Sequence, residues 1–318
     1  MRTHPISEII EGRGCLMLDG GLAAELEARG HDLNHPLWSA RLLLENPLAI
    51  EAAHLAFLNA GADCLISASY QATPQGMMEL GLSRTEAARL IRFSHRLAMD
   101  AWECFVDSGG GDDRSVEPLV AASIGPYGAY LADGSEYRGD YGLSPARLVD
   151  FHRERFEILS DEADLLAIET IPCVDEAVAL RELLLEDGRT AAWVSFTCRD
   201  GGHLASGERI RDAAELLADV PAVVAVGVNC TAPQHVSSLV EEIQQACPDK
   251  PVLVYPNSGE TYRAEDKSWI RDSTGAGMEN AVQEWVDLGV QGIGGCCRVA
   301  AADLKGLHEK LGVLWTRR

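Results

Sequence analysis

Three cysteines are suited to chemistry by type and position, because they could share one metal ion. Cys230 follows an apolar run, and Cys296 and Cys297 are adjacent and follow two glycines. Zn²⁺ binds cysteine sulfur, and a catalytic zinc site has three protein ligands and an open fourth position. Neighbouring cysteines on a regular strand point to opposite faces, so both can bind one ion only where the strand has ended. Gly294 and Gly295 favour such an end, and the three cysteines therefore predict a zinc site.

The positions of these thiols also allow other interpretations. Cys230 could be a buried core thiol beside an adjacent pair that is incidental or joined in a strained disulfide. Cys198 could supply a fourth ligand and close a purely structural zinc site. The chain begins MRTHPISEII, without the basic and apolar segments of a signal peptide, so free thiols are favoured over a disulfide framework. Spacing alone leaves these alternatives open.

Two carboxylates are the second feature that could take part in chemistry. Asp19 ends the first apolar run of the chain, and Glu169 follows the fourth. A pair of anions beside an open metal site would suit an ammonium group, such as the α-amino group of an amino acid. The structural alternatives are that Asp19 caps the following helix and that Glu169 pairs with an arginine. If both are functional, the site binds a zwitterion that carries sulfur.

The elements that must position these residues alternate along the chain. Short apolar runs rich in β-branched residues are each followed by a turn and then by a longer stretch of helical period. Strands are predicted at 15–19, 63–67, 119–123, 164–168, 192–196, 223–228, 252–255 and 290–294. Helices are predicted at 47–60, 85–106, 145–161, 174–186, 209–217, 233–246, 279–288 and 300–311. These units predict an α/β fold, a single-domain (β/α)₈ TIM barrel over residues 1–318.

Chemistry in such a barrel takes place at the C-terminal ends of the strands, because the loops converge there. The predicted strands place Asp19, Glu169 and the three cysteines on this face. A doubly wound open sheet is the alternative, but the turn at Gly20 and Gly21 lacks the G-x-G-x-x-G pattern of a dinucleotide fold. The stretch 256–278 has too little periodicity for a helix and is expected to cover the barrel mouth.

Composition and charge limit the classes of partner. The 318 residues are 47% hydrophobic and 24% charged, a balance typical of a chain that buries a large core. The formal net charge of −22 predicts a surface that repels nucleic-acid phosphates and anionic lipid headgroups. No apolar run approaches the roughly 20 residues of a membrane span. We therefore expect small-molecule substrates, no nucleic-acid or membrane partner, a cytoplasmic location and a monomer or small homo-oligomer.

Several stretches resemble the homocysteine S-methyltransferase family over nearly the full length of the chain. The most specific is GVNC from Gly227 followed by GGCCR from Gly294, which is the zinc signature of that family. Further matches are DGGLAAELEARGHDLN from Asp19, ASYQAT from Ala68, SIGPYGAYLADGSEYRGDY from Ser123, ETIPCVDEA from Glu169, SFTCRDGGHLASGE from Ser195 and YPNSGE from Tyr255.

The resemblance implies a role for each matching site residue. It implies Zn²⁺ as the cofactor, with Cys230, Cys296 and Cys297 as the catalytic metal ligands. The same resemblance assigns Asp19 and Glu169 to the amino group of homocysteine. Further members of the substrate pocket are expected to be Gln71, Asn229 and Tyr255.

The implied reaction is methyl transfer from S-methylmethionine, with S-adenosylmethionine as a further donor, to the thiol of L-homocysteine, giving methionine. The chain resembles the single-domain S-methylmethionine-dependent branch, because it lacks the C-terminal extension of the betaine-dependent branch and the folate and cobalamin domains of the large methionine synthases. Tyr127, Tyr255 and Trp269 are candidates for facing the sulfonium. The alternatives are the same reaction with betaine or another donor, and a non-enzymatic zinc-binding or redox-sensing barrel.

Overall fold

Eight parallel strands form a barrel in the computed structural model, which describes residues 5–33, 38–110, 118–263, 268–271 and 278–315. They pair in the order β1-β10-β7-β6-β5-β4-β3-β2, and a parallel bridge between Leu18 and Cys64 joins β1 to β2. Their bounds are Leu16–Met17 (β1), Cys64–Ile66 (β2), Leu119–Ile124 (β3), Leu165–Ile171 (β4), Ala191–Phe196 (β5), Val223–Asn229 (β6), Val252–Tyr255 (β7) and Gly292–Ile293 (β10). The predicted (β/α)₈ barrel and its eight strands are confirmed.

The inside of the barrel is packed with side chains. Trp193 and Leu253 belong to an inner cluster of buried residues to which the strands β1 to β7 contribute. Ile6 and Ile9 of helix α1 (Pro5–Arg13), both fully buried, belong to the same cluster. This helix, which the sequence did not predict, packs against the N-terminal ends of the strands. The C-terminal face is left for a binding site.

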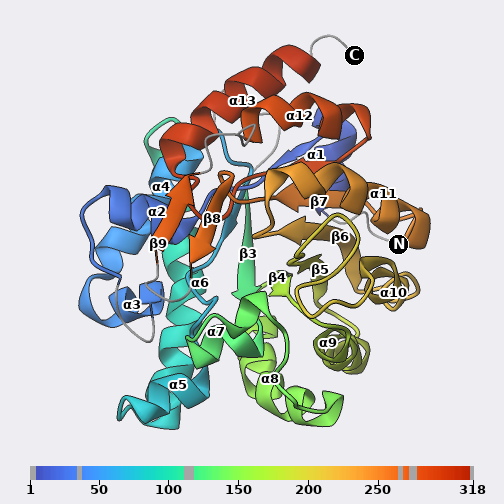
Figure 1. Cartoon of the computed structure of the whole chain (residues 1–318). Helices are drawn as coiled ribbons and strands as arrows, with labels where there is room; N and C mark the ends of the chain where they lie inside the picture. The colour runs from blue at the N-terminus through green and yellow to red at the C-terminus, as the bar shows by residue number, and fades with distance from the viewer. Residues whose placement is uncertain (1–4, 34–37, 111–117, 264–267, 272–277, 316–318) are drawn as a thin grey trace.

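Eight of the described helices surround the barrel at the predicted positions (Figure 1). They are α4 (Pro47–Asn59), α6 (Arg84–Asp107), α8 (Pro145–Ser160), α9 (Val174–Asp187), α10 (Ile210–Glu215), α11 (Val236–Ala246), α12 (Met278–Asp287) and α13 (Ala301–Trp315). Pro47 and Pro145 begin α4 and α8, where a missing N–H leaves no bond unmade. Ser83 and Glu86 form a reciprocal capping box at the start of α6. None of these or the other described helices is long and apolar enough to cross a membrane.

Short helical segments that the sequence did not predict lie in several loops. In the described residues they are α2 (Leu22–Ala28), η1 (Trp38–Arg41) and α3 (Leu42–Glu45) after β1, α5 (Pro74–Glu79) after β2, and α7 (Tyr127–Leu131) and η2 (Ser135–Tyr137) after β3. The short η3 (Pro233–His235) after β6 is the first turn of the predicted helix 233–246, which continues as α11. Each unpredicted segment is too short to give a clear helical period in the sequence. Because these loops follow the strands, the segments build up the C-terminal face.

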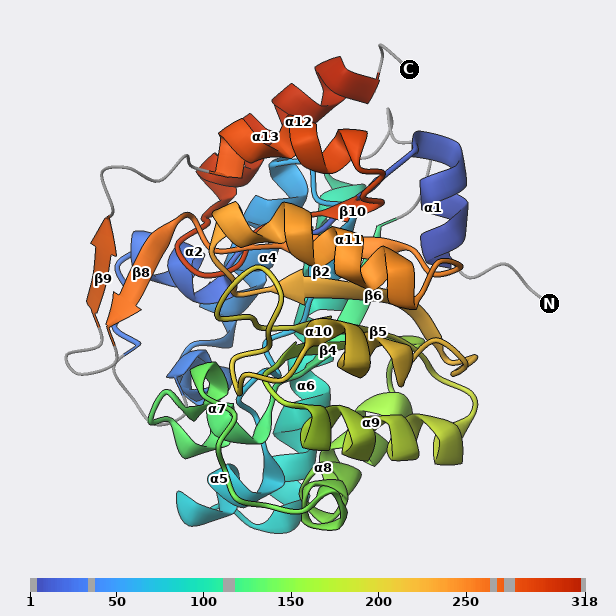
Figure 2. The ribbon, with the colours of Figure 1, turned by 45° about the vertical axis from the view of Figure 1, so that its right-hand side comes forward.

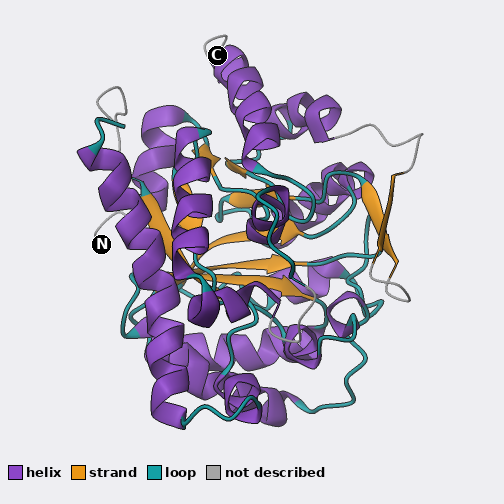
Figure 3. Ribbon diagram, turned by 90° about the vertical axis from the view of Figure 1, so that its left-hand side faces the viewer, coloured by secondary structure: helices purple, strands orange, loops and turns teal. Residues whose placement is uncertain are grey.

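The stretch 256–278, which the sequence predicted to be non-helical and to cover the barrel mouth, contains an antiparallel hairpin. Strand β8 (Glu260–Arg263) pairs with β9 (Ser268–Arg271), and part of the remaining stretch lies outside the described residues. Figures 2 and 3 show the hairpin outside the ring of helices, at one side of the molecule. Strands of four residues are too short for an alternating pattern to be recognised, which is why the prediction missed them.

Candidate active site at the C-terminal ends of the strands

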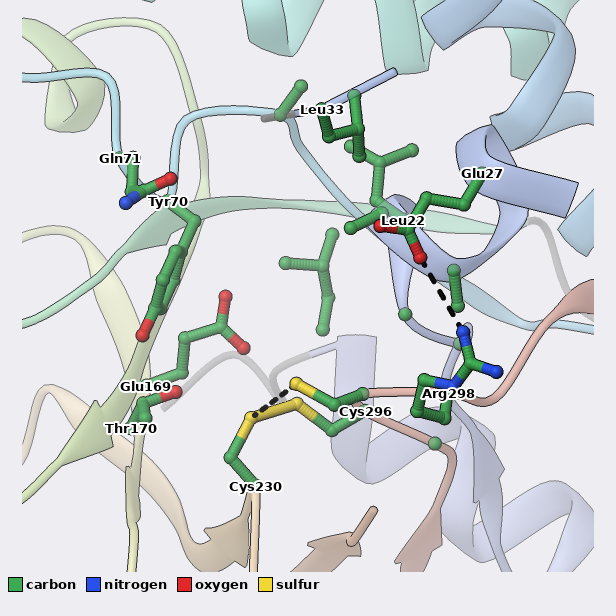
Figure 4. Close-up of a pocket in the computed structure, with 18 of the residues that line it drawn as sticks. Leu22, Glu27, Leu33, Tyr70, Gln71, Glu169, Thr170, Cys230, Cys296 and Arg298 are labelled. Atoms are coloured by element: carbon green, nitrogen blue, oxygen red, sulfur yellow. Dashed lines mark hydrogen bonds and ion pairs between the residues drawn. A yellow bond between two sulfur atoms is a disulfide. The ribbon is translucent and has the colours of Figure 1, made fainter. Parts of the chain in front are cut away.

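A cavity of about 720 Å³ opens at the C-terminal ends of the strands. Its lining combines residues that follow or end β1, β2, β4, β6, β7 and β10 with residues from α2 and η2. Asp19, Glu169 and all three cysteines of the predicted zinc site are among them. In Figure 4 the carboxylate of Glu169 lies between Tyr70 and the sulfur atoms of Cys230 and Cys296. The barrel therefore brings together side chains that are far apart in the sequence.

The three predicted metal ligands form one sulfur cluster. The Sγ atoms of Cys230, Cys296 and Cys297 lie within 4.8 Å of one another, an arrangement that could hold a metal ion. Cys230 and Cys296 are joined by a disulfide, and Cys297 Sγ lies 3.8 Å from Cys230 Sγ. Metal binding needs thiolates, so this pair binds a metal only after reduction. The disulfide does not join the adjacent cysteines, and Cys198 is not part of the cluster found among the described residues.

The backbone explains how cysteines from two distant segments meet. Cys230 follows β6 with a left-handed φ of 46°, and its N–H donates to the carbonyl oxygen of Tyr255 at 3.3 Å. Strand β10 ends at Ile293, and a Cβ on Gly294 would lie only 2.6 Å from the Cβ of Leu18. A glycine is therefore needed where the chain leaves the strand and turns both adjacent cysteines toward Cys230.

Asp19 is a buried carboxylate that the protein satisfies only in part. Its Oδ2 accepts a hydrogen bond from the N–H of Ile66 at 2.8 Å, and in the described part of the chain no donor reaches the buried Oδ1. Burial raises the pKa of Asp19 well above its usual value, and the negative charge of Glu169 raises it further. Helix α2 begins at Leu22 with Gly21 as its N-cap and no side-chain cap, so Asp19 does not cap it.

Glu169 is directed into the cavity at an irregularity in β4. The register of β4 against β5 shifts at Glu169 and Thr170, and Thr170 has a left-handed φ of 63°. The carboxylate accepts hydrogen bonds from the hydroxyls of Ser123 and Tyr255. Burial nevertheless raises the pKa of Glu169 to about 7. No arginine or lysine perturbs this pKa, so the expected alternative of an ion pair with arginine finds no support in the described residues.

Asn229 holds the irregular segment of β4 through hydrogen bonds to Thr170. It is not one of the residues that line the cavity. It is fully buried, its Oδ1 accepts from the N–H of Thr170 at 2.8 Å, and its Nδ2 donates to Thr170 Oγ1 at 2.7 Å. The same Nδ2 lies 4.0 Å from Cys296 Sγ. The side chain of Asn229 thus connects the segment that carries Glu169 with the sulfur cluster.

Gln71 and Tyr255 both line the cavity. Gln71 donates from Nε2 to the carbonyl oxygen of Ala129 at 2.8 Å, and its buried Oε1 has no donor within the described structure. The hydroxyl of Tyr255 accepts from Trp193 Nε1 at 3.0 Å and donates to Glu169. Gln71 therefore offers an acceptor to a ligand, whereas Tyr255 orients Glu169.

Three further lining residues, Tyr70, Glu136 and Tyr137, were not predicted. The hydroxyl of Tyr137, in η2, is 3.6 Å from Cys297 Sγ. Tyr70 precedes Gln71 in the loop after β2. The sequence signal for these residues was their place in two stretches that resemble the family, SIGPYGAYLADGSEYRGDY from Ser123 and ASYQAT from Ala68, to which no site role was assigned at these positions.

The proposed aromatic contacts to a sulfonium are placed differently. Tyr127 is not a lining residue, and its ring packs edge-on against Phe151 with the ring centroids 4.8 Å apart. The hydroxyl of Tyr255 is already engaged by Trp193. Trp269 belongs to β9, and its side chain lies outside the described part of the structure.

Arg298 is the only arginine or lysine among the described lining residues. Its guanidinium lies 3.7 Å from the carboxylate of Glu27, as Figure 4 shows, and both side chains are partly exposed. A guanidinium at the rim of the cavity suits the carboxylate of an amino acid.

A buried charged network holds the loop that carries Tyr70. Arg155 of α8 is 1% exposed and donates to the carbonyl oxygens of Tyr70 and Gly125. It also contacts His152, whose Nε2 lies 2.8 Å from a carboxylate oxygen of Glu176. Burial lowers the pKa of His152, which favours the neutral ring. Arg155 thus fixes the backbone of two loops at the cavity wall.

Comparison with known proteins agrees with this site. A model of the homocysteine S-methyltransferase family matches residues 16–311. Homocysteine S-methyltransferase YbgG from Bacillus subtilis is 44% identical over 303 residues, which cover 95% of this chain and 96% of that protein. The crystal structures of the homocysteine methyltransferase MmuM from Escherichia coli in its metallated and oxidized forms are 42% identical, with TM-scores of 0.85 and 0.86. They cover 96% and 97% of this chain and 100% of each matched chain. The chain belongs to the homocysteine S-methyltransferase family.

Proposed function

We propose that this protein transfers a methyl group from S-methylmethionine to the thiol of L-homocysteine, giving methionine, and that S-adenosylmethionine is a further donor. One observation carries the proposal. Asp19 and Glu169 are buried acids that share a cavity with three clustered cysteine sulfurs, and no protein cation lies between them in the described structure. An ammonium group and a sulfur on one small molecule would satisfy both parts of the cavity.

The donor set fits a zinc ion, which we propose as the cofactor. Three cysteine sulfurs within 4.8 Å of one another match the soft ligands and the three-ligand pattern of a catalytic zinc site. Bound zinc would hold the homocysteine sulfur as a thiolate at neutral pH. The metallated form of the Escherichia coli relative supports a metal in this family.

The chain's own residues bind and orient the acceptor. Asp19 offers its unsatisfied Oδ1 and Glu169 its carboxylate to the ammonium group. A positive charge between them lowers the pKa of both acids, so both are ionised in the complex. Asn229 and Tyr255 keep Glu169 in place, and Arg298 is positioned for the substrate carboxylate.

The reaction is balanced without an oxidant or reductant. One C–S bond of the donor sulfonium breaks, and its electron pair stays on the donor sulfur, which becomes a neutral thioether. A new C–S bond forms to the homocysteine sulfur, and the thiol proton leaves to solvent. With S-methylmethionine both products are methionine, so an assay must mark the acceptor.

The test supplies ¹⁵N-homocysteine to reduced, zinc-loaded protein with S-methylmethionine, S-adenosylmethionine, betaine or methyltetrahydrofolate in parallel. We expect ¹⁵N-methionine with S-methylmethionine, its loss on chelation and its return with zinc. Turnover with only betaine or methyltetrahydrofolate would move the protein to another donor branch. No turnover with any donor would contradict the proposed activity.

The disulfide between Cys230 and Cys296 favours a second candidate, a zinc-binding barrel that senses redox state without catalysis. Such a protein has no need to bind an amino acid. Calorimetric binding of homocysteine to the reduced zinc form, weakened by Asp19→Asn, would exclude this candidate.

We further propose a cytoplasmic protein of one domain over residues 1–318 that acts on small molecules.

A further inference from the structure

A second acidic position lies in the same cavity, apart from the proposed ammonium site. Glu136 belongs to η2 and lines the cavity, and its Oε2 is buried with no hydrogen-bond donor among the described residues. The nearby Arg138 lies 3.6 Å from a carboxylate oxygen of Asp133 and 3.4 Å from one of Asp140. Two other carboxylates therefore compete for this cation, and one oxygen of Glu136 is left for a ligand.

Aromatic side chains and the sulfur cluster share the cavity with this carboxylate. Tyr70, Tyr137 and Cys297 line the same cavity as Glu136, and Tyr137 follows Glu136 directly in η2. The hydroxyl of Tyr137 is 3.6 Å from Cys297 Sγ, so η2 reaches the cysteines.

The geometry of methyl transfer requires the donor sulfonium to lie close to the acceptor sulfur. The carbon that moves must lie about 3–3.5 Å from the acceptor sulfur before it reacts. If the acceptor's ammonium lies at Asp19 and Glu169 and its sulfur at the cysteines, the donor must enter beside another wall of the cavity.

Glu136 and Tyr137 of η2, together with Tyr70, place a carboxylate and two tyrosines at one wall of the cavity, which we call the η2 wall. The hydroxyl of Tyr137 lies next to Cys297. Aromatic faces and an anion are the groups that bind an alkylated cation.

We propose that Glu136, Tyr70 and Tyr137 form the subsite that binds the positive sulfonium of the methyl donor. This assignment rests on the proposed function, since it needs a cationic donor. Tyr70 and Tyr137 exclude water from the sulfonium, and Glu136 supplies the charge that balances it. The subsite would also accept other alkylated cations of similar size.

The charge change during the reaction gives this subsite a distinctive kinetic effect. The sulfonium loses its positive charge as the methyl group leaves, so the attraction to Glu136 is weaker in the transition state than in the bound donor. An interaction that is stronger in the ground state lowers KM without raising kcat. A purely structural role for Glu136 would change kcat and the homocysteine KM as well.

The experiment compares Glu136→Gln with Glu182→Gln, which removes one negative charge from an exposed position on α9. In Glu136→Gln we expect the KM for S-methylmethionine to rise about 10–100-fold, as for the loss of a charged contact. We expect kcat to stay the same or rise, and zinc content and the KM for homocysteine to stay within about twofold. Glu136→Asp keeps the charge but shortens the side chain, so its KM for S-methylmethionine should lie between those of the wild-type protein and Glu136→Gln.

A non-reacting cation provides a second readout. Tetramethylammonium should inhibit the wild-type protein in competition with S-methylmethionine, and its inhibition constant should rise about tenfold or more in Glu136→Gln. An unchanged donor KM and inhibition constant in an active Glu136→Gln would overturn the subsite and leave the proposed function intact. Absence of turnover by the wild-type protein would overturn both.

Discussion

Cys297 offers a clean test at the scale of a residue, because it remains a free thiol while Cys230 and Cys296 are joined. Cys297→Ser should lose bound zinc and lower methionine formation at least about 100-fold, since it removes one of three ligands. Zinc content and activity would be measured on the same reduced sample. Cys198→Ser is the matched control, because Cys198 is buried outside the cluster and should be dispensable for both.

A full equivalent of zinc in Cys297→Ser would show that the ligand assignment is mistaken.

Asp19→Asn separates binding of the homocysteine ammonium from binding of zinc. It leaves all three sulfurs in place and removes a charge from the proposed ammonium site. We therefore expect unchanged zinc content and a higher KM for homocysteine.

Glu169 connects ligand binding with stability. Its pKa in the folded protein is about 7, raised by burial from 4.5, so its contribution to stability is fully present below about pH 4.5 and lost as pH rises through about 7. Glu169→Gln should raise the free energy of unfolding of the ligand-free protein by about 1–3 kcal/mol near pH 8. The gain should vanish near pH 4.

Chemical denaturation at both pH values measures this difference, with Glu182→Gln as the surface control. An equal gain in the free energy of unfolding at the two pH values would contradict the cost of ionising the buried Glu169. The same variant should have a raised KM for homocysteine, because the neutral amide cannot balance the ammonium. Stability and function would then change in opposite directions at one residue.

At the scale of elements, α8 holds the cavity wall through Arg155. Arg155→Met leaves the carbonyl oxygens of Tyr70 and Gly125 without their buried donor, which should destabilise the protein by about 2–5 kcal/mol. The donor KM should rise because Tyr70 shifts. Arg155→Lys restores a charged donor and should recover part of both effects. Thermal unfolding and donor kinetics check this, and an unchanged donor KM in folded Arg155→Met would rule out the positioning role.

The sequence predicted the elements that have a clear period and missed those that do not. The eight barrel strands were found because their apolar runs recur between helices, and Cys296 and Cys297 were placed correctly because two glycines mark the end of β10. The segment η2, with Glu136, was missed because three residues in a long loop carry no period. The side chain of Asn229 turns toward Thr170 and not into the cavity, a detail that only the irregularity of β4 reveals.

At the scale of the molecule, the closed barrel turns sequence separation into proximity. Asp19 follows the first strand and Cys297 the last, and the bridge between Leu18 and Cys64 makes the sheet continuous around the cavity. Helix α1 fills the opposite end with Ile6 and Ile9. In the proposed site the three cysteines follow strand ends, whereas Glu136 and Tyr137 lie in a long loop. Substitutions in that loop should therefore change donor preference and leave the sulfur cluster in place.

The most direct measurement of the central claim follows both reactants in one product. Reduced, zinc-loaded protein would receive ¹⁵N-homocysteine and S-methylmethionine with deuterated methyl groups, and methionine would be analysed by mass spectrometry. The account predicts methionine that carries both the ¹⁵N and the deuterated methyl group, formed only when zinc is present. Doubly labelled methionine formed equally well without zinc, or none formed with it, would contradict the account.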